Sequence, residues 1–325
     1  MEDTWGDDVR IPLMTAPCPL CHTVSRDILA DTLRRGTGKV YRCQPCDLGF
    51  LVAEKHAPDY YARDYRQQAS HKADGAATNP EEIFEVYSRY QEQRLQLVTR
   101  HLPILNKYPA ILEIGASAGQ FLRHFNGYGY RLCAIELDPA CCEYMKRMDI
   151  ETDDHELRMS KFAGEKFDVV VAFQVIEHVD DPVSFMRDIR SVLRPGGVAI
   201  IECPNLRDGL MQIWDIEEYR KFYYHADHLW YFGNRGLEKI AEQAGFASVD
   251  VKFTQDYGFC NHLHWLMNRT PQADCHVGLG RPIFRSKNPT MTGWLAAKLA
   301  EMNAEYIDKL VAAGATSNIT LIAKG

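Results

Sequence analysis

Four cysteines near the start of the chain have the types and spacing of a metal site. They form two Cys-x-x-Cys pairs, Cys18/Cys21 and Cys43/Cys46, separated by residues 22–42. Four thiolates presented from two turns suit a tetrahedral Zn²⁺ ion, which lowers their pKa and leaves no coordination position for catalysis. We therefore expect a structural zinc site. A disulfide-bonded or an unliganded quartet is the alternative.

The segment "ILEIGASAGQF" (111–121) has the composition of a ligand-binding turn. A dinucleotide loop needs Gly-x-Gly-x-x-Gly, so that the backbone can approach a pyrophosphate at a helix start. Here Gly115 is followed by Ser117 and Gln120 at the second and third glycine positions. Glu113, just before the loop, would repel a phosphate and attract a cation. The pattern argues against a dinucleotide and favours a cationic ligand.

A third group of reactive side chains lies in "FYYHADHLWYF" (222–232). Removing a proton from an alcohol or a carbon acid requires a base with a pKa near the working pH, and histidine meets this requirement. We take His228 as the first candidate for the base, His225 as the second, and Asp227 as their acidic partner. Packing and capping at a helix start is the alternative role of this segment.

The elements that must position these groups alternate along the chain. Short apolar runs lie at 110–114, 131–136, 167–173 and 197–203, with helical stretches at 118–126, 139–148 and 182–193 between them. Such alternation predicts an α/β fold with a doubly wound, mostly parallel sheet, whose ligands bind at the carboxyl ends of the strands. A helix at 234–244, a strand at 247–253 and a last strand in "NITLIAKG" continue the pattern.

Five segments are predicted along the chain. They are a zinc-binding module (1–70), a linker and helix (71–104), a core (105–255), a helical insertion (256–315) and the last core strand (316–325). The linker proper is "KADGAATNP" (72–80), and a helix is expected over 80–101. The insertion contains an amphipathic helix at 292–313, which serves as a lid over the ligand or as a dimer face.

The overall composition excludes several classes of protein. With 46% hydrophobic and 25% charged residues, it is that of a globular protein. A net charge of −7 argues against a nucleic-acid ligand. The sequence has no apolar run long enough to span a membrane and no secretory signal at its acidic start, so we expect a cytoplasmic protein.

Several motifs together resemble class I S-adenosylmethionine-dependent methyltransferases. They are the loop Glu113-x-Gly115-x-x-x-Gly119, "LCAIELDP" with Glu136, "FDVVVAFQVIEHVDDP" followed by "LRPGGVAIIECPN", and "EQAGF" (242–246). The resemblance covers about residues 105–255 and the final strand. It implies a seven-stranded Rossmann-like sheet and S-adenosylmethionine as the cofactor, whose ammonium and sulfonium supply the cations.

The resemblance also assigns cofactor-binding positions. It implies that the ribose hydroxyls bind Glu136 beside Leu137, that the adenine binds an acidic residue after the third strand, and that Gln174 meets the methionine portion. Asp153 and Asp154 are the candidates for the adenine contact, and we favour Asp154. The residues expected to bind the cofactor are Glu113, Gly115, Ala116, Ser117, Gly119, Glu136, Leu137, Asp154 and Gln174.

The paired cysteines, followed by "DYYARDY" (59–65) and the core, resemble bacterial methyltransferases of sugars, sugar nucleotides and other small metabolites. Sugar C-methyltransferases carry a Tyr-His-Glu-His-like stretch whose last His is the base. Asp227 and His228 match its end, whereas Ala226 replaces a His, which leaves O- and C-methylation both open. His178 is a further substrate-facing candidate, and Tyr60, Tyr61 or Tyr65 either closes over the ligand or packs on the core.

Three further alternatives are kept open. One is an RNA methyltransferase, because a zinc-bearing methyltransferase of ribosomal RNA is known, and another is a non-catalytic scaffold. The third is a divalent metal at Glu177–His178, because ubiquinone-pathway O-methyltransferases resemble "VIEHV" (175–179). Their upstream acidic ligand corresponds to Gln174, which is a poor metal ligand.

Overall fold

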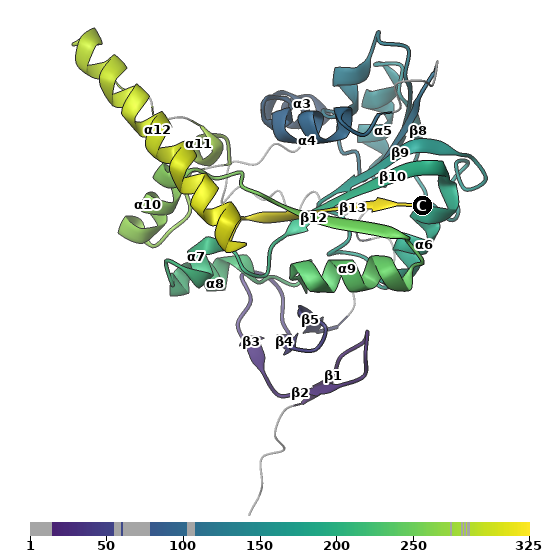
Figure 1. The fold of residues 1–325 in the computed structure, drawn as a ribbon, viewed down its shortest axis with the longest axis horizontal. Helices are drawn as coiled ribbons and strands as arrows, with labels where there is room; N and C mark the ends of the chain where they lie inside the picture. Colours follow the sequence, from purple (N-terminus) through teal and green to yellow (C-terminus); the bar gives the residue numbers. More distant parts are fainter. Residues whose placement is uncertain are drawn as a thin grey trace, which may run out of the picture.

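The computed structural model describes residues 15–54, 60, 79–102, 108–273, 275–280, 282, 284 and 287–325, and it is built around a seven-stranded sheet (Figure 1). The strand order is β12-β13-β10-β9-β6-β7-β8. Neighbours from β10 to β8 pair in parallel, whereas β13 runs antiparallel to β10 and to β12. The predicted α/β class with a mostly parallel sheet is confirmed. The strands are β6 (Ala110–Ile114), β7 (Arg131–Ile135), β8 (Glu151–Asp153), β9 (Phe167–Phe173), β10 (Leu193–Pro204), β12 (Ser248–Thr254) and β13 (Asn318–Lys324).

Helices cover both faces of this sheet, so both faces are buried. Successive side chains of a strand point to opposite faces and therefore enter different core clusters. Ile111 in β6 faces a core cluster with Val98 of α4 and Met145 of α5. Leu112, the next residue, faces a second cluster with Ile189 of α6 and Ile240 of α9. Figure 1 shows α3, α4 and α5 on one side of the sheet and α6 and α9 on the other. The helices are α3 (Pro80–Tyr87), α4 (Glu92–Thr99), α5 (Pro139–Lys146), α6 (Pro182–Val192), α7 (Gly209–Gln212), α8 (Glu217–Tyr223) and α9 (Asn234–Gln243).

The cysteine-bearing module packs below α9 in Figure 1 and shares a sheet with the core. Its strands are β1 (Ala16–Pro17), β2 (Val24–Ser25), β3 (Ile28–Ala30), β4 (Lys39–Cys43) and β5 (Leu48–Val52). β5 pairs antiparallel with β11 (Trp230–Phe232), which gives a four-stranded sheet of order β11-β5-β4-β3. The strand that ends the predicted histidine segment (222–232) is therefore part of the module's sheet.

Two predicted helices are shorter in the structure. The helix expected over 80–101 is divided, because a 3₁₀ turn, η2 (Ser88–Tyr90), interrupts it and the Ser88 hydroxyl bonds back to the Phe84 carbonyl at 2.5 Å. The helix expected over 118–126 is a 3₁₀ turn, η3 (Leu122–Phe125), because Gly119 is left-handed (φ +76°) and ends helical geometry there. Of the predicted linker, only residues 79 and 80 are described, and Tyr61 and Tyr65 lie outside the described residues.

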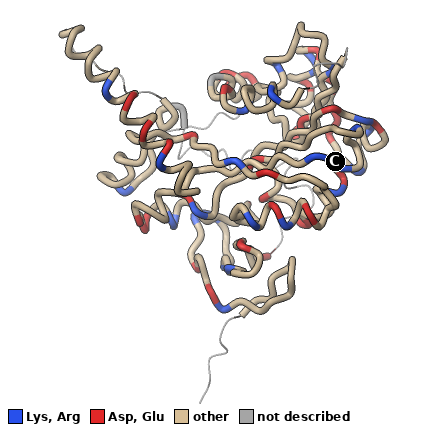
Figure 2. The backbone as a smooth tube through the Cα atoms, viewed as in Figure 1, with Lys and Arg blue, Asp and Glu red and all other residues tan. Residues whose placement is uncertain are grey.

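The insertion forms α10 (Phe259–Asn268), α11 (Cys275–Leu279) and α12 (Pro289–Ala313), and α12 projects from the body of the protein (Figure 1). Its base is anchored by Tyr306, which accepts a hydrogen bond from Trp214 Nε1 at 2.6 Å. Basic and acidic residues both occur along α9 and along α12 (Figure 2). Among the described residues, no helix combines the length and apolarity needed to cross a membrane.

Candidate functional site

The predicted cofactor loop leaves β6 at the carboxyl edge of the sheet and contains three left-handed residues. Gly115, Ser117 and Gly119 have φ values of +73°, +50° and +76°. A Cβ atom on Gly115 would lie 2.5 Å from Val175 Cγ2, and one on Gly119 would lie 2.7 Å from Met145 Cγ. Both glycines are therefore required by backbone conformation and by close packing. Ala116, between them, is fully buried.

Glu113 is a buried carboxylate, with only 3% of its surface exposed, at the foot of this loop. Its Oε2 atom has no hydrogen-bond partner among the described residues. Burial, together with the nearby charge of Glu136, raises the pKa of Glu113 well above its usual value, although Arg94 opposes the shift. Leaving a charged acceptor buried and unpaired is costly. The site therefore fits a cationic ligand such as the S-adenosylmethionine ammonium.

Glu136 follows the end of β7, and backbone amides hold its carboxylate. Ser117 N donates to one oxygen at 2.7 Å and Asp138 N donates to the other at 3.0 Å. The side chain is half-buried, as is that of Leu137. The structure thus brings the predicted ribose-binding carboxylate against the predicted glycine loop.

The two acidic candidates for the adenine contact differ in their environment. Asp153 accepts hydrogen bonds from His155 N at 3.0 Å and Lys161 N at 2.9 Å, so its carboxylate shapes the loop after β8. Asp154 is exposed and lies 3.0 Å from His155 Nδ1. Of the two, Asp154 is the more accessible to a ligand.

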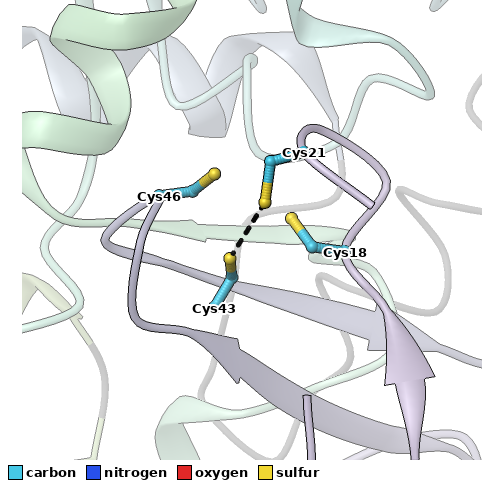
Figure 3. A group of neighbouring side chains, drawn as sticks. All are labelled: Cys18, Cys21, Cys43 and Cys46. Carbon is cyan, nitrogen blue, oxygen red and sulfur yellow. Dashed lines mark hydrogen bonds between the residues drawn. The ribbon is translucent and has the colours of Figure 1, made fainter. Parts of the chain in front are cut away.

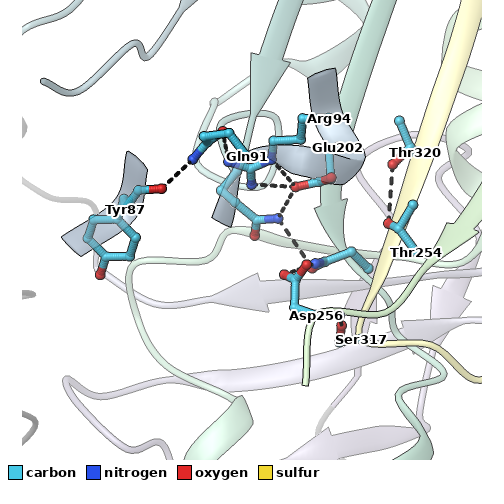
Figure 4. A network of polar contacts seen from close by, with 10 residues as sticks. Tyr87, Gln91, Arg94, Glu202, Thr254, Asp256, Ser317 and Thr320 are labelled. Atoms are coloured by element: carbon cyan, nitrogen blue, oxygen red, sulfur yellow. Dashed lines mark hydrogen bonds and ion pairs between the residues drawn. The ribbon is translucent and has the colours of Figure 1, made fainter. Parts of the chain in front are cut away.

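Gln174 has a left-handed backbone (φ +59°) and belongs to a polar network at the ends of β9 and β10, of which Figure 4 labels Arg94 and Glu202. Its Nε2 atom donates to Glu202 Oε1 and to Asn318 Oδ1, both at 3.2 Å. Arg94 of α4 donates from Nε to the same Glu202 oxygen at 3.0 Å. Its guanidinium lies 4.5 Å from the centre of the Phe173 ring.

Sequence reasoning missed Arg94 and Glu202. Glu202 had a signal, because a carboxylate inside the apolar run "VAIIECP" is unusual for a buried strand. No such signal marks Arg94 in the sequence, because "QEQRLQLV" is typical of an ordinary amphipathic helix.

A cavity of about 160 Å³ lies beside this network. His225, His228 and Asn318 line the cavity. Asn318 also accepts the hydrogen bond from Gln174 and so connects the cavity wall to the network. The remaining walls of the cavity are largely aromatic or acidic. They include Tyr219, Phe222, Tyr223, Tyr257, Asp208 and Asp256. Two of the predicted catalytic histidines therefore line the cavity, and the predicted methionine contact, Gln174, is hydrogen-bonded to a third lining residue, Asn318.

Asp227 is buried next to His225, and its carboxylate contacts three side chains. Tyr60 donates its hydroxyl to one carboxylate oxygen at 2.7 Å, and Arg35 Nη2 lies 3.3 Å from the other. His225 Nδ1 is also 3.3 Å from that second oxygen. Burial alone would raise the pKa of Asp227, but the contacts with His225, Tyr60 and Arg35 hold it below the usual range. The carboxylate is therefore ionised at neutral pH.

The three histidines are in contact with one another. The His228 ring centre lies 3.8 Å from that of His225 and 4.8 Å from that of His178. Burial and the neighbouring His225 and His178 lower the pKa of His228 well below its usual value, so the ring is neutral at neutral pH. His228 Nδ1 has no hydrogen-bond partner among the described residues. The sequence matched Asp227 with His228, whereas in the structure the carboxylate is closer to His225.

Glu177, His178 and His228 form a group that could hold a divalent cation. Each offers one ligand atom, and these atoms lie within 4.8 Å of one another. Both Glu177 oxygens lack hydrogen-bond partners among the described residues, and burial raises the pKa of Glu177 to about 8. Gln174 is not part of this group, because its side chain is directed to Glu202 and Asn318.

The cysteine quartet converges on one point (Figure 3). The Sγ atoms of Cys18, Cys21, Cys43 and Cys46 lie within 4.8 Å of one another, and those of Cys21 and Cys43 are 3.5 Å apart. Tetrahedral Zn–S bonds of about 2.3 Å require sulfurs about 3.8 Å apart. Lys239 of α9 donates to Cys46 Sγ at 3.2 Å, which suits a thiolate. The donor set and spacing fit zinc.

Comparison with known proteins gives one family match. A model described as a methyltransferase domain matches residues 52–251, more than half of the chain. The ubiquinone biosynthesis O-methyltransferase of Dinoroseobacter shibae is 34% identical over 94 residues, which cover 28% of this chain and 38% of that protein. The same-named protein of Parvibaculum lavamentivorans is 54% identical over 43 residues, 13% of this chain and 17% of the relative. The chain thus matches well under two thirds of these relatives.

Solved structures with a similar arrangement have low sequence identity. A S-adenosylmethionine-dependent methyltransferase from Archaeoglobus fulgidus is 15% identical, with a TM-score of 0.47, covering 74% of this chain and 99% of that one. Phosphoethanolamine N-methyltransferase 2 of Haemonchus contortus, in complex with S-adenosylmethionine, is 17% identical, with a TM-score of 0.49. The match covers 85% of this chain and 61% of that one.

Proposed function

This chain belongs to the methyltransferase domain family, and on that premise we propose that it transfers the methyl group of S-adenosylmethionine to a small polar acceptor, a sugar or a sugar nucleotide. The observation that carries the proposal is the cavity lined by His225 and His228, which adjoins the predicted cofactor site through Asn318 and Gln174. The proton-accepting groups therefore lie in a cavity whose wall, at Asn318, is hydrogen-bonded to the predicted methionine contact Gln174.

The cofactor-binding residues divide the ligand among them. Glu113 would pair with the ammonium, Glu136 would accept hydrogen bonds from the ribose hydroxyls, and Asp154 would contact the adenine. Arg94, held next to Gln174 by Glu202, is positioned to pair with the carboxylate of the methionine portion. When bound, the cofactor supplies an electrophilic methyl carbon on a sulfonium, so the task of the protein is to align an acceptor in line with that bond.

His228 is the proposed base. Its neutral ring accepts the proton from an acceptor hydroxyl or acidic carbon as that atom bonds to the methyl carbon, and the electrons of the broken S–C bond return to sulfur. The positive charge then on the histidine pair is stabilised by ionised Asp227, 3.3 Å from His225. His178 Nδ1 lies 2.7 Å from the Asp227 carbonyl, which fixes that ring beside His228.

The sugar assignment rests on the size and lining of the cavity. About 160 Å³ accommodates one ring, and faces such as those of Tyr219 and Tyr257 suit a sugar ring. The nucleotide of a sugar nucleotide would lie outside this space. The relatives are named O-methyltransferases, which favours oxygen over carbon as the acceptor atom.

The test uses the whole chain with methyl-labelled S-adenosylmethionine and a panel of acceptors: sugar nucleotides, free sugars, phenolic acids and total RNA. We expect label in a sugar or sugar nucleotide, and His228→Ala should lower this turnover at least tenfold while cofactor affinity stays within twofold. Label in RNA, with binding that weakens steeply with salt, would establish the nucleic-acid alternative. An inability to bind the cofactor would leave the scaffold alternative.

The panel is repeated with EDTA and with added Mg²⁺ or Mn²⁺, because Glu177, His178 and His228 form a candidate cation group. Turnover unchanged by EDTA is expected if His228 is free to act as the base. Turnover that requires the added cation would assign His228 to the metal and leave His225 as the base.

We also propose that the cysteine quartet binds one structural Zn²⁺ ion, supported by the convergence of its sulfurs. Elemental analysis of the purified chain should give about one zinc per chain, and Cys18→Ser should lose it together with thermal stability. Cys260→Ser is the matched control, because that half-buried thiol lies outside the quartet. Full zinc content in Cys18→Ser would refute the site.

A further inference from the structure

The cysteine-bearing module holds the segment that carries the proposed base. In its loop between β3 and β4, Arg34 N donates a hydrogen bond to the Tyr224 carbonyl at 2.8 Å, and Arg34 lines the cavity together with His228. The next residue of the loop, Arg35, accepts a hydrogen bond at its carbonyl from Ala226 N at 3.1 Å. At the end of the histidine segment, β11 pairs antiparallel with β5 of the module. The segment is therefore attached to the module at two places.

The turn that contains Cys46 is fixed against the end of β11. Asp47 in this turn is 2% exposed and left-handed (φ +51°), and its carboxylate accepts a hydrogen bond from Arg207 Nη2 at 2.6 Å. Its carbonyl accepts one at 2.9 Å from the amide of Gly233, the residue directly after β11. The packing is close, because a Cβ atom on Gly236 would lie 2.8 Å from the Asp47 carbonyl oxygen. Asp47 thus ties the cysteine turn to two points of the core.

The same turn carries two of the four candidate metal ligands. Cys43 ends β4, and Cys46 and Asp47 come directly before Leu48, which begins β5 and pairs with Phe232 of β11. Thiolates that share one ion fix the turn between them, and in small modules this binding contributes to folding. Short strands such as β5 and β11 are marginal without such a constraint. The order of β11 therefore depends on the cysteine turn.

The contacts that shape the predicted cofactor site come from the core. Glu136 accepts hydrogen bonds from Ser117 N at 2.7 Å and from Asp138 N at 3.0 Å. Glu202 accepts one from Arg94 Nε at 3.0 Å. These residues belong to the loop after β6, the start of α5, α4 and β10. The cofactor half and the acceptor half of the proposed site are thus held by different parts of the chain.

We propose that the module is a positioning element of the acceptor site, and that a divalent cation bound to its thiolates controls this site separately from cofactor binding. Cys43 and Cys46 hold the turn in place when they bind the ion, Asp47 transmits this order to β11, and β11 keeps His225 and His228 at the cavity. The metal-free chain still binds S-adenosylmethionine but lacks an ordered acceptor site. The inference rests on the proposed function for the role of the two histidines.

The experiment follows amide hydrogen exchange by mass spectrometry in the full chain with and without its metal, because exchange reports local opening of the fold. EDTA under reducing conditions removes the ion, and elemental analysis confirms the loss. Amides of residues 222–233 should then exchange about tenfold faster, whereas those of β6 and β7 should change less than twofold. The dissociation constant of S-adenosylhomocysteine, measured by calorimetry, should stay within twofold.

Readding Zn²⁺ should restore slow exchange in residues 222–233, and readding Mg²⁺ should not. This comparison separates the cysteine quartet from the group of Glu177, His178 and His228, which could also lose a cation to EDTA.

Asp47→Asn tests the route within the chain, because it removes the charge paired with Arg207 but keeps a residue that tolerates the left-handed conformation. It should keep about one zinc per chain and the wild-type affinity for S-adenosylhomocysteine, while exchange in residues 222–233 rises about threefold or more. Asp31→Asn is the matched control, because Asp31 is an exposed aspartate of the same module, and it should exchange as the wild type does. If Asp47→Asn fails to fold, Arg207→Gln removes the same ion pair from the core side.

The inference is overturned if exchange in residues 222–233 is unchanged after metal removal, or if the variant that removes the ion pair leaves it unchanged. An equal rise in β6 and β7, or loss of S-adenosylhomocysteine binding on metal removal, would show instead that the module stabilises the whole fold. A chain purified without zinc that still protects residues 222–233 also overturns it. A metal-bound wild type that binds no S-adenosylhomocysteine would refute the proposed function, whatever the exchange shows.

Discussion

Replacing Glu113 by glutamine should weaken cofactor binding and at the same time stabilise the free protein. The substitution preserves the shape of the side chain but removes its charge. A hydrogen bond to a charged group contributes about 1.5–3 kcal/mol. Losing the hydrogen bond between Glu113 and the cofactor ammonium should therefore raise the dissociation constant of S-adenosylmethionine about 10- to 150-fold. Titration calorimetry with S-adenosylmethionine measures this change.

The free protein should respond in the opposite direction, because the pKa of Glu113 in the folded state lies well above its usual value. A carboxyl group whose pKa is raised by folding destabilises the folded state at any pH above the unfolded-state pKa, and the cost grows until the folded-state pKa is reached. Glu113→Gln removes this cost at neutral pH. Its melting temperature without ligand should therefore exceed that of the wild type.

The same linkage gives binding a pH dependence. The cofactor cation favours ionised Glu113, so wild-type affinity should rise with pH until the pH passes the raised pKa, with protons released below it. Calorimetry in buffers of different ionisation enthalpy detects that release, and Glu113→Gln should lack it. Glu143→Gln is the control, because that glutamate is exposed on α5 and pairs with Lys146. Unchanged affinity in Glu113→Gln, or a lower melting temperature of the free variant, would refute the reasoning.

Three further predictions concern the loop, the missed arginine and the buried aspartate. Gly115→Ala should cost more stability than Gly127→Ala in thermal melts, because both positions are left-handed but only the Gly115 Cβ meets a neighbour, at 2.5 Å; left-handed strain alone costs about 1–2 kcal/mol, and equal losses would contradict the clash. Arg94→Met should raise the dissociation constant of S-adenosylmethionine about tenfold or more by calorimetry, since a charged hydrogen bond of about 1.5 kcal/mol or more is lost; wild-type affinity would exclude the proposed carboxylate contact. Asp227→Asn should lower the pKa of His225, because the carboxylate opposes the lowering of that pKa by burial; NMR titration of the His225 ring measures this change, and an unmoved titration would show that Asp227 does not act on His225. Its stability deficit should narrow only below about pH 4, because a carboxyl with a lowered folded-state pKa stabilises the fold above its unfolded-state pKa and loses this effect as pH falls.

The sequence by itself determined the central sheet. Short, mostly apolar runs such as 110–114 and 167–173 coincide with β6 and β9 because strands buried on both faces need mainly apolar side chains, and that requirement is local. The glycine loop was equally visible, since Gly115 and Gly119 adopt left-handed conformations that few other residues tolerate. The convergence of the four cysteines could be predicted because two Cys-x-x-Cys turns leave a short repeated pattern in the sequence.

Only the tertiary structure decided how these pieces meet. Nothing in the sequence indicates that β11 joins the module's sheet or that Arg34 reaches the cavity beside His228, because strand pairing across long separations depends on packing of the whole chain. The same holds for Arg94 and Glu202, which come from α4 and β10, and for Asp227, which lies against His225 instead of its expected neighbour. The sequence shows which types of group are available for chemistry. Which of them share a buried space, and so shift one another's pKa, is set by the fold.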